Sequence, residues 1–129
     1  MKRSAILQPL SREHHTALSL AKTCERAALS GESAQIEQAC QRAILAFSTE
    51  LEPHIQFEEQ SLLPLLKSME TQALVQRTLA DHERLRALLD GLQQTDVVAL
   101  DDFGKCLTAH VRFEERELFA VLESLLEAR

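Results

Sequence analysis

Histidine and glutamate recur at helical spacing in this sequence. His54 and Glu58 are four residues apart, and so are His110 and Glu114. In an α-helix, residues four apart lie on the same face with Cβ atoms about 5–6 Å apart, so each pair can bind one metal ion. Imidazole suits iron, zinc, copper and nickel, and carboxylate can bridge two hard cations, so a His/Glu site without thiolate favours iron over zinc. Each pair is therefore a candidate chelate.

Two more histidines, His14 and His82, each follow an acidic residue. An antiparallel helical bundle can bring them to the level of the two chelates. Four imidazoles and two carboxylates would leave room on two metals roughly 3.5–4 Å apart for a small exogenous ligand or water, or could saturate one metal. We predict iron, with two ions favoured and mononuclear iron or zinc as alternatives. The predicted metal ligands are His14, His54, Glu58, His82, His110 and Glu114, with His15 as a further candidate.

His14 and His15 compete for the first position in this set. His14 shares its helical face with the apolar residues Leu10 and Ala17, whereas His15 shares its face with Lys22. The pattern therefore favours His14. His15 is left as an extra ligand, a partner of a ligand or a surface residue.

The carboxylates are harder to explain without a metal than the histidines. A single histidine on an apolar face is more often a hydrogen-bonded core residue, but a buried, unpaired glutamate costs several kcal/mol or takes up a proton. Glu58 and Glu114 at matched positions therefore indicate cations. Glu59 and Glu115 lie one residue beyond the chelating spacing and are predicted to face solvent, although Glu115 could replace Glu114.

Apolar residues at 3.6-residue spacing predict the helices that would position these side chains. Ser11 is the expected N-cap of the first helix, with Glu13 in its first turn, and Gly31 is its expected stop. Pro53 is expected to bend the second helix, and Gly104 only to weaken the first turns of the last. The predicted helices run from Ser11 to about Leu29, from Ser33 to about Lys67, from about Thr71 to Leu92, and from Val97 or Asp101 to Leu126.

The turns between these helices are short, so consecutive helices should pack as antiparallel neighbours. The expected fold is an all-α, up-down-up-down four-helix bundle. The chain also repeats itself: the segment from Leu51 to Glu59 aligns with the segment from Leu107 to Glu115, and Glu13-His14 pairs with Asp81-His82. The first two predicted helices therefore carry the same pattern of candidate ligands as the last two.

The composition narrows the function classes. The 129 residues fit a single domain, predicted over residues 1–129. A net charge of -6 without Trp or Tyr argues against a nucleic-acid partner and against a tyrosyl-radical mechanism. No apolar stretch is long enough for a membrane span or a secretory segment, so we expect a cytoplasmic protein. Three widely spaced cysteines, Cys24, Cys40 and Cys106, are expected to be reduced thiols that pack in the core.

The motifs together resemble the hemerythrin HHE cation-binding family, and the resemblance covers essentially the whole chain. It implies an up-down bundle with a non-haem iron site whose ligands fall on the six residues above. The motifs are Arg12-Glu13-His14-His15, His54-x-x-x-Glu58-Glu59 followed by Leu62-Leu63-Pro64, Asp81-His82, and His110-x-x-x-Glu114-Glu115 followed by Leu118-Phe119.

One position departs from the family's oxygen carriers, which place two histidines one turn apart on the third helix. Here Arg86 stands four residues after His82. The resemblance therefore points to a protein that binds or senses O2, NO or peroxide, or that handles iron. A redox enzyme of the peroxidase, catalase or iron–sulfur-cluster-repair type is the alternative, and a purely structural bundle is a third. The sequence assigns no catalytic residue, and it leaves a monomer and a homodimer both open.

Overall fold

The computed structural model describes residues 3–127, and every regular element among them is helical. The predicted all-α four-helix bundle is confirmed. Residues 1, 2, 128 and 129, the ends of the predicted domain, lie outside the described residues. The elements are α1 (Gln8–Ser30), α2 (Ser33–Ala46), the π-helical turn η1 (Phe47–Leu51), α3 (Glu52–Phe57), the π-helical turn η2 (Glu58–Leu62), the 3₁₀ turns η3 (Leu63–Leu65) and η4 (Met69–Thr71), α4 (Gln72–Gln93), α5 (Val97–Phe113), the π-helical turn η5 (Glu114–Leu118) and α6 (Phe119–Glu127).

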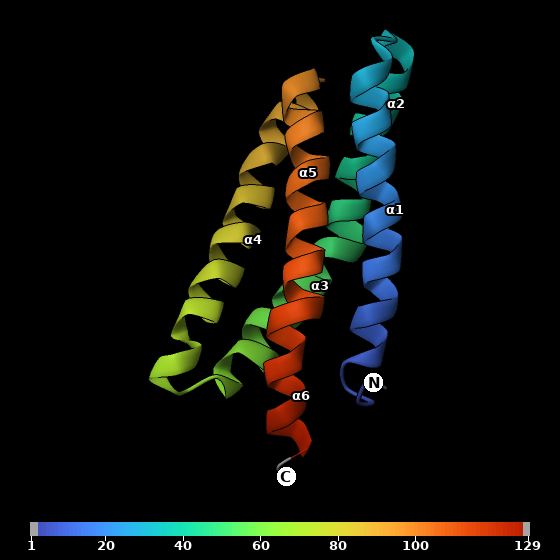
Figure 1. The fold of residues 1–129 in the computed structure, drawn as a ribbon. Helices are drawn as coiled ribbons and strands as arrows, with labels where there is room; N and C mark the ends of the chain where they lie inside the picture. Colours follow the sequence, from blue (N-terminus) through green and yellow to red (C-terminus); the bar gives the residue numbers. More distant parts are fainter. Residues whose placement is uncertain (1–2, 128–129) are drawn as a thin grey trace.

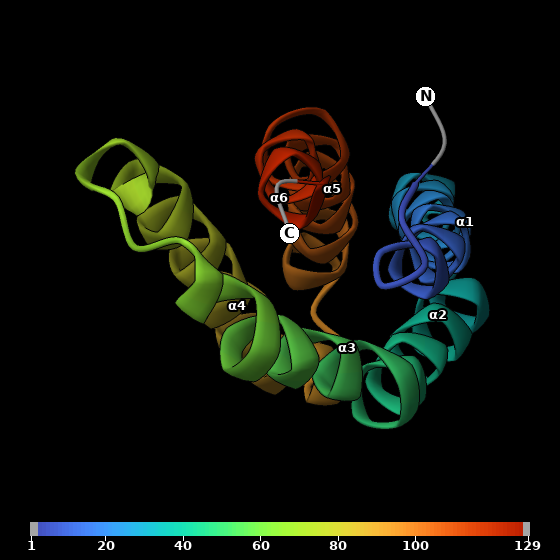
Figure 2. The same ribbon diagram turned by 90° about the horizontal axis from the view of Figure 1, so that it is seen from below.

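The chain forms four rods that alternate in direction (Figure 1). The first is α1, the second runs from α2 to η3, the third is α4, and the fourth runs from α5 to α6. Seen end-on, α2 and α3 cross between α1 and α4, while α5 and α6 lie on the opposite side (Figure 2). No helix among residues 3–127 combines the length and apolarity needed to cross a membrane.

The helix ends agree only in part with the sequence-based expectation. Helix α1 begins at Gln8, with Pro9 in its first turn, so Ser11 and Glu13 lie further inside the helix than predicted. Proline fits the first turn because backbone N–H groups there have no acceptor within the helix, so the N–H that proline lacks is not missed. Gly31 ends the helix as predicted, with a left-handed φ of 68°.

The second rod is helical throughout, but it is not one α-helix. A π-helical turn, η1, comes directly before Glu52 and Pro53. Pro53 cannot donate to the α-helical ladder, and its ring crowds the carbonyl four residues back, so the irregular turn lies where the ladder is interrupted. The other two π-helical turns begin at Glu58 and at Glu114. Both predicted chelating glutamates therefore start a π turn, an irregularity that is frequent at functional sites.

The apolar core consists of two clusters. The larger contains Leu20, Phe103 and Leu107, and the smaller contains Leu62 and Leu118. The buried histidines and glutamates belong to neither cluster. Residues of both clusters nevertheless border the polar groups, since Phe119 stacks on His14 and Leu107 lines a cavity with His110.

Gly104 has a packing role that the sequence did not reveal. A Cβ atom at this position would lie 2.7 Å from the carbonyl oxygen of Ala21 and 2.8 Å from Cγ of Glu25. Helices α1 and α5 thus approach each other closely because residue 104 has no side chain. The expectation that this glycine only weakens a helix was incomplete, since the contact depends on the partner helix.

Candidate metal centre

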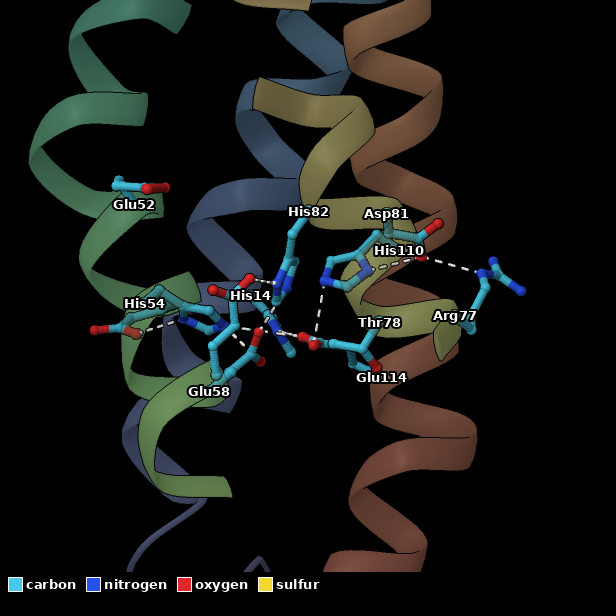
Figure 3. Close-up of polar contacts among 12 residues, drawn as sticks. His14, Glu52, His54, Glu58, Arg77, Thr78, Asp81, His82, His110 and Glu114 are labelled. Atoms are coloured by element: carbon cyan, nitrogen blue, oxygen red, sulfur yellow. Dashed lines mark hydrogen bonds and ion pairs between the residues drawn. The ribbon is translucent and has the colours of Figure 1, made fainter. Parts of the chain in front are cut away.

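Six buried side chains from all four rods meet inside the bundle. They form two groups, in each of which the candidate ligand atoms all lie within 4.8 Å of one another. Glu58 and Glu114 belong to both groups, and they approach each other from the second and fourth rods (Figure 3). The first group is His14, His54, Glu58 and Glu114, and the second is Glu58, His82, His110 and Glu114.

Each glutamate directs one oxygen toward each group. For Glu58, Oε2 lies 3.0 Å from Nε2 of His54, and Oε1 lies 3.1 Å from Nε2 of His82. For Glu114, Oε1 lies 2.8 Å from Nε2 of His14, and Oε2 lies 3.2 Å from Nε2 of His110. This is the arrangement that two carboxylates would need to bridge a pair of cations.

Two atoms of the second group lack a hydrogen-bond partner. Among buried side-chain nitrogens and oxygens of residues 3–127, only Nε2 of His110, Oε2 of Glu114 and the hydroxyl of Ser4 have none. A buried polar atom without a partner is costly. The imidazole nitrogen and the carboxylate oxygen lie 3.2 Å apart as an ion pair without a hydrogen bond, so a cation between them would satisfy both. The donor set therefore fits a metal.

The outer nitrogen of each imidazole faces a second carboxylate. Such a contact fixes the ring orientation and leaves Nε2 free to bind a metal. Two of these carboxylates directly precede a ligand histidine in the sequence, and two directly follow a ligand glutamate. The Nδ1 contacts are His14 to Glu115 at 2.6 Å, His54 to Glu13 at 2.7 Å, His82 to Glu59 at 2.7 Å, and His110 to Asp81 at 2.8 Å.

The prediction that Glu59 and Glu115 face solvent was incomplete, because each of them contacts an imidazole. Burial acts to raise the pKa of Glu59, but His82 and Arg86 outweigh it and lower that pKa. In the same way, contacts with His14 and other donors lower the pKa of Glu115 despite its partial burial. Both carboxylates stay ionised beside an imidazole. Glu114, rather than Glu115, is the fourth-rod carboxylate in both ligand groups.

Burial and mutual contacts shift the pKa values of His54, His110, Glu58 and Glu114. Burial acts to lower the pKa of His54, but the carboxylates of Glu114 and Glu58 raise it to about 11. Burial also opposes the charged form of His110, and Glu114 and Asp81 raise its pKa to about 10. Burial and the charge of Glu114 raise the pKa of Glu58. Burial works in the same direction on Glu114, but the imidazoles hold its pKa well below the usual value. Without an ion, protons supply the positive charge that the carboxylates require.

Comparison with known protein families agrees with this geometry. Residues 5–122 match the hemerythrin HHE cation binding domain. The chain belongs to the hemerythrin HHE family. Neither the curated proteins nor the solved structures that were compared with the chain include a match.

Two residues singled out in the sequence lie outside the ligand groups of this hemerythrin domain. His15 is exposed, because it lies one position around α1 from the buried His14. Arg86 does not point at the ligands. Its guanidinium contacts Glu52 at 3.0 Å and Glu59 at 3.3 Å, so it holds the carboxylate that contacts His82.

A small apolar cavity of about 20 Å³ borders the hemerythrin ligands. Besides His14, His54 and His110, its walls include the apolar side chains Leu85 and Leu107. On the side of the smaller core cluster, the ring of Phe119 stacks on His14 with centroids 5.2 Å apart. Apolar groups therefore border the candidate metal centre on these sides.

The cysteines take no part in either ligand group. Cys24 and Cys40 are buried and Cys106 is half-buried, and all three are free thiols. Burial is the main cause that raises the pKa of Cys24, to about 12. They fit the predicted packing role, since a buried neutral thiol behaves as a small apolar group.

Proposed function

We propose that the protein binds two iron ions between Glu58 and Glu114, and that this centre binds or senses O2, NO or peroxide, or handles iron. The observation that carries the proposal is that Glu58 and Glu114 each offer one carboxylate oxygen to each of the two ligand groups. A single ion would not use all four of these oxygens, and a purely structural bundle would bury the two carboxylates at a cost in stability.

Iron is proposed from the chemistry of the donors. Each group offers two imidazoles and two carboxylates and no thiolate. Imidazole with carboxylate and open positions is a donor set of non-haem iron. Bound iron would supply Lewis acidity and a redox-active centre for small oxygen or nitrogen species. The chain's own part is to fix the four imidazoles through their outer carboxylates and to surround them with apolar side chains.

The size of the adjoining cavity supports a small exogenous ligand. At about 20 Å³, it is close to the space of a single water molecule, and much smaller than the pocket of a typical organic substrate. Its apolar walls favour an uncharged molecule such as O2 or NO. We also propose that the protein works in the cytoplasm, where free thiols such as Cys24 and Cys40 persist.

A redox enzyme is the second candidate, of the peroxidase, catalase or iron–sulfur-cluster-repair type. It is supported by the position of Arg86, which lies outside the ligand groups where the family's oxygen carriers supply another imidazole. Each group then has only four protein ligands, which would leave positions for a reactant.

One comparison separates the two candidates. The iron-loaded protein would be cycled between O2 and an inert gas while its iron-to-ligand absorption band is recorded, and its consumption of hydrogen peroxide would be measured separately. Reversible bleaching and recovery of the band without sustained peroxide loss supports binding. Sustained peroxide loss over many turnovers supports the enzyme, and a protein that takes up no transition metal contradicts both.

A further inference from the structure

The four outer carboxylates differ in how firmly they are held. Three of them also contact an arginine, so that an imidazole, a carboxylate and a guanidinium form a chain. A carboxylate that already contacts an arginine is fixed in place, so it loses little further conformational freedom when it orients its imidazole. The three arginine contacts are Arg3 to Glu115 at 3.0 Å, Arg77 to Asp81 at 3.0 Å, and Arg86 to Glu59 at 3.3 Å.

Glu13, the outer partner of His54, lacks such an arginine. Among residues 3–127 its ion-pair partner is His54 alone. Its side chain is 56% exposed, whereas Glu115, the next most exposed of the four, is 30% exposed. Water therefore competes for this carboxylate, although its 2.7 Å contact with Nδ1 of His54 is part-buried. His54 is the imidazole whose outer carboxylate has the fewest charged partners among residues 3–127.

The backbone around His54 is also the least regular. His54 lies in α3, a segment of six residues between the π-helical turns η1 and η2. His110, its counterpart in the fourth rod, follows a long stretch of α-helix in α5. His54 is also the most exposed of the four ligand histidines, at 9%. Short segments with irregular hydrogen bonding open more readily than long regular helices.

A groove of about 490 Å³ reaches His54 from the surface. It runs between α1 and the second rod, and most of its lining is apolar. Its polar and charged lining residues are Glu13, Thr16, Arg42, Thr49, Glu50 and His54 itself, so carboxylates outnumber the single arginine. The small apolar cavity adjoins this groove at Glu13, Ala17, Leu51 and His54, and by itself it is too small to pass a hydrated ion. The groove therefore combines space, an exposed carboxylate and the ligand histidine whose outer carboxylate has the fewest charged partners.

We propose that this groove is the route by which a divalent cation reaches and leaves the centre, and that His54 is the ligand that turns aside to let it pass. Glu13 provides an oxygen for the cation on the way. It follows that the group containing His14 and His54 exchanges its ion faster than the group containing His82 and His110. The inference rests on the proposed two-metal centre.

The test uses Co²⁺ as a spectroscopic probe bound to the 129-residue chain. Cobalt-loaded protein is mixed with excess chelator, and the loss of the cobalt absorption is followed by stopped-flow. We expect two phases of equal amplitude. Thr49→Phe should narrow the groove and slow the fast phase severalfold without changing the slow one.

The chain offers a matched control in Ser48→Phe. Ser48 and Thr49 are both exposed in η1, and both hydroxyls donate to the carbonyl oxygen of Leu45, but only Thr49 lines the groove. The Ser48→Phe variant should release cobalt as the unmodified protein does. A single phase, equal slowing by both variants, or no slowing by Thr49→Phe would overturn the proposal.

A second pair of variants tests the role of the arginines. Arg77→Gln removes the contact to Asp81 and should speed the slow phase toward the fast one, because Asp81, the outer partner of His110, then loses its second contact. Arg84→Gln, which removes an exposed contact to Asp102, should leave both phases unchanged. An unchanged slow phase in Arg77→Gln would overturn the assignment of the slow site.

Metal stoichiometry keeps the two proposals separate. If the unmodified protein binds two cobalt ions but releases them without regard to the groove, the access route is wrong and the two-metal centre stands. If it binds fewer than two ions, the proposed centre itself fails.

Discussion

Asp81 offers the sharpest single-residue test of how the metal centre is held. Its Oδ2 lies 2.8 Å from Nδ1 of His110, and the same oxygen is 3.0 Å from Nε of Arg77. Burial acts to raise the pKa of Asp81, but His110 and Arg77 lower it, so the carboxylate is ionised at neutral pH. It fixes the orientation of the ring and adds negative charge behind it, which increases the basicity of the nitrogen that faces the centre.

The expected losses differ between two substitutions. Asp81→Asn retains an oxygen that can accept from Nδ1 but removes the charge, so metal affinity should fall by about tenfold, or ~1.4 kcal/mol. Asp81→Ala also removes the acceptor, which leaves the Nδ1–H of His110 without its partner and the ring free to turn. Affinity should then fall by about 100-fold, or ~2.8 kcal/mol.

Competition with a chromophoric chelator for Co²⁺ or Zn²⁺ measures both values. Asp102→Ala is the control, because the ion pair that Asp102 makes among residues 3–127 is an exposed contact with Arg84. Its affinity should equal that of the unmodified protein. If Asp81→Ala also binds metal as tightly as the unmodified protein, His110 does not depend on Asp81 and the reasoning is refuted. Equal losses for Asn and Ala would show that charge alone matters.

Three further predictions follow from the same geometry. Glu58→Ala should lose both ions, since this carboxylate serves both groups, whereas His82→Ala should lose mainly one; equal metal content in the two variants would contradict the shared carboxylate. The pKa values of His54 and His110 are raised to about 11 and 10, so both imidazoles are protonated at pH 7 and must lose a proton to bind metal. Metal uptake should therefore release protons, metal affinity should rise with pH, and acid should expel iron. Iron retention that is unchanged down to about pH 4 would contradict this. Gly104→Ala should lower the free energy of unfolding by about 1–3 kcal/mol in urea titrations, because the clash with α1 outweighs a propensity gain of about 1 kcal/mol; a raised unfolding midpoint would contradict it.

The fold and the convergence of the candidate ligands were largely predictable from the sequence. Apolar spacing, Gly31 and the polar residues between helices predict four rods, and antiparallel packing brings the paired histidines and glutamates to one level. The π-helical turns were not predictable in this way. A π-helical turn has no apolar spacing of its own that a sequence could reveal. Pro53 indicates that the helix is interrupted, but it does not indicate which kind of turn forms there.

The outer carboxylates were missed for a different reason. Glu59 and Glu115 follow the chelating glutamates directly, and a residue one position further around a helix usually faces solvent. The internal repeat contained the missing information, because an acidic residue accompanies a ligand at matched places in both halves. Their contacts with His82 and His14 also depend on which helices are neighbours, and a linear pattern does not show that.

The central claim is that Glu58 and Glu114 bridge two iron ions inside this bundle. Diffraction at the iron absorption edge, from crystals of the iron-loaded protein, tests it most directly. We expect two anomalous peaks, one beside the imidazoles of His14 and His54 and one beside those of His82 and His110, with both carboxylates between them. No peak there, or a single ion bound elsewhere on the chain, would contradict it.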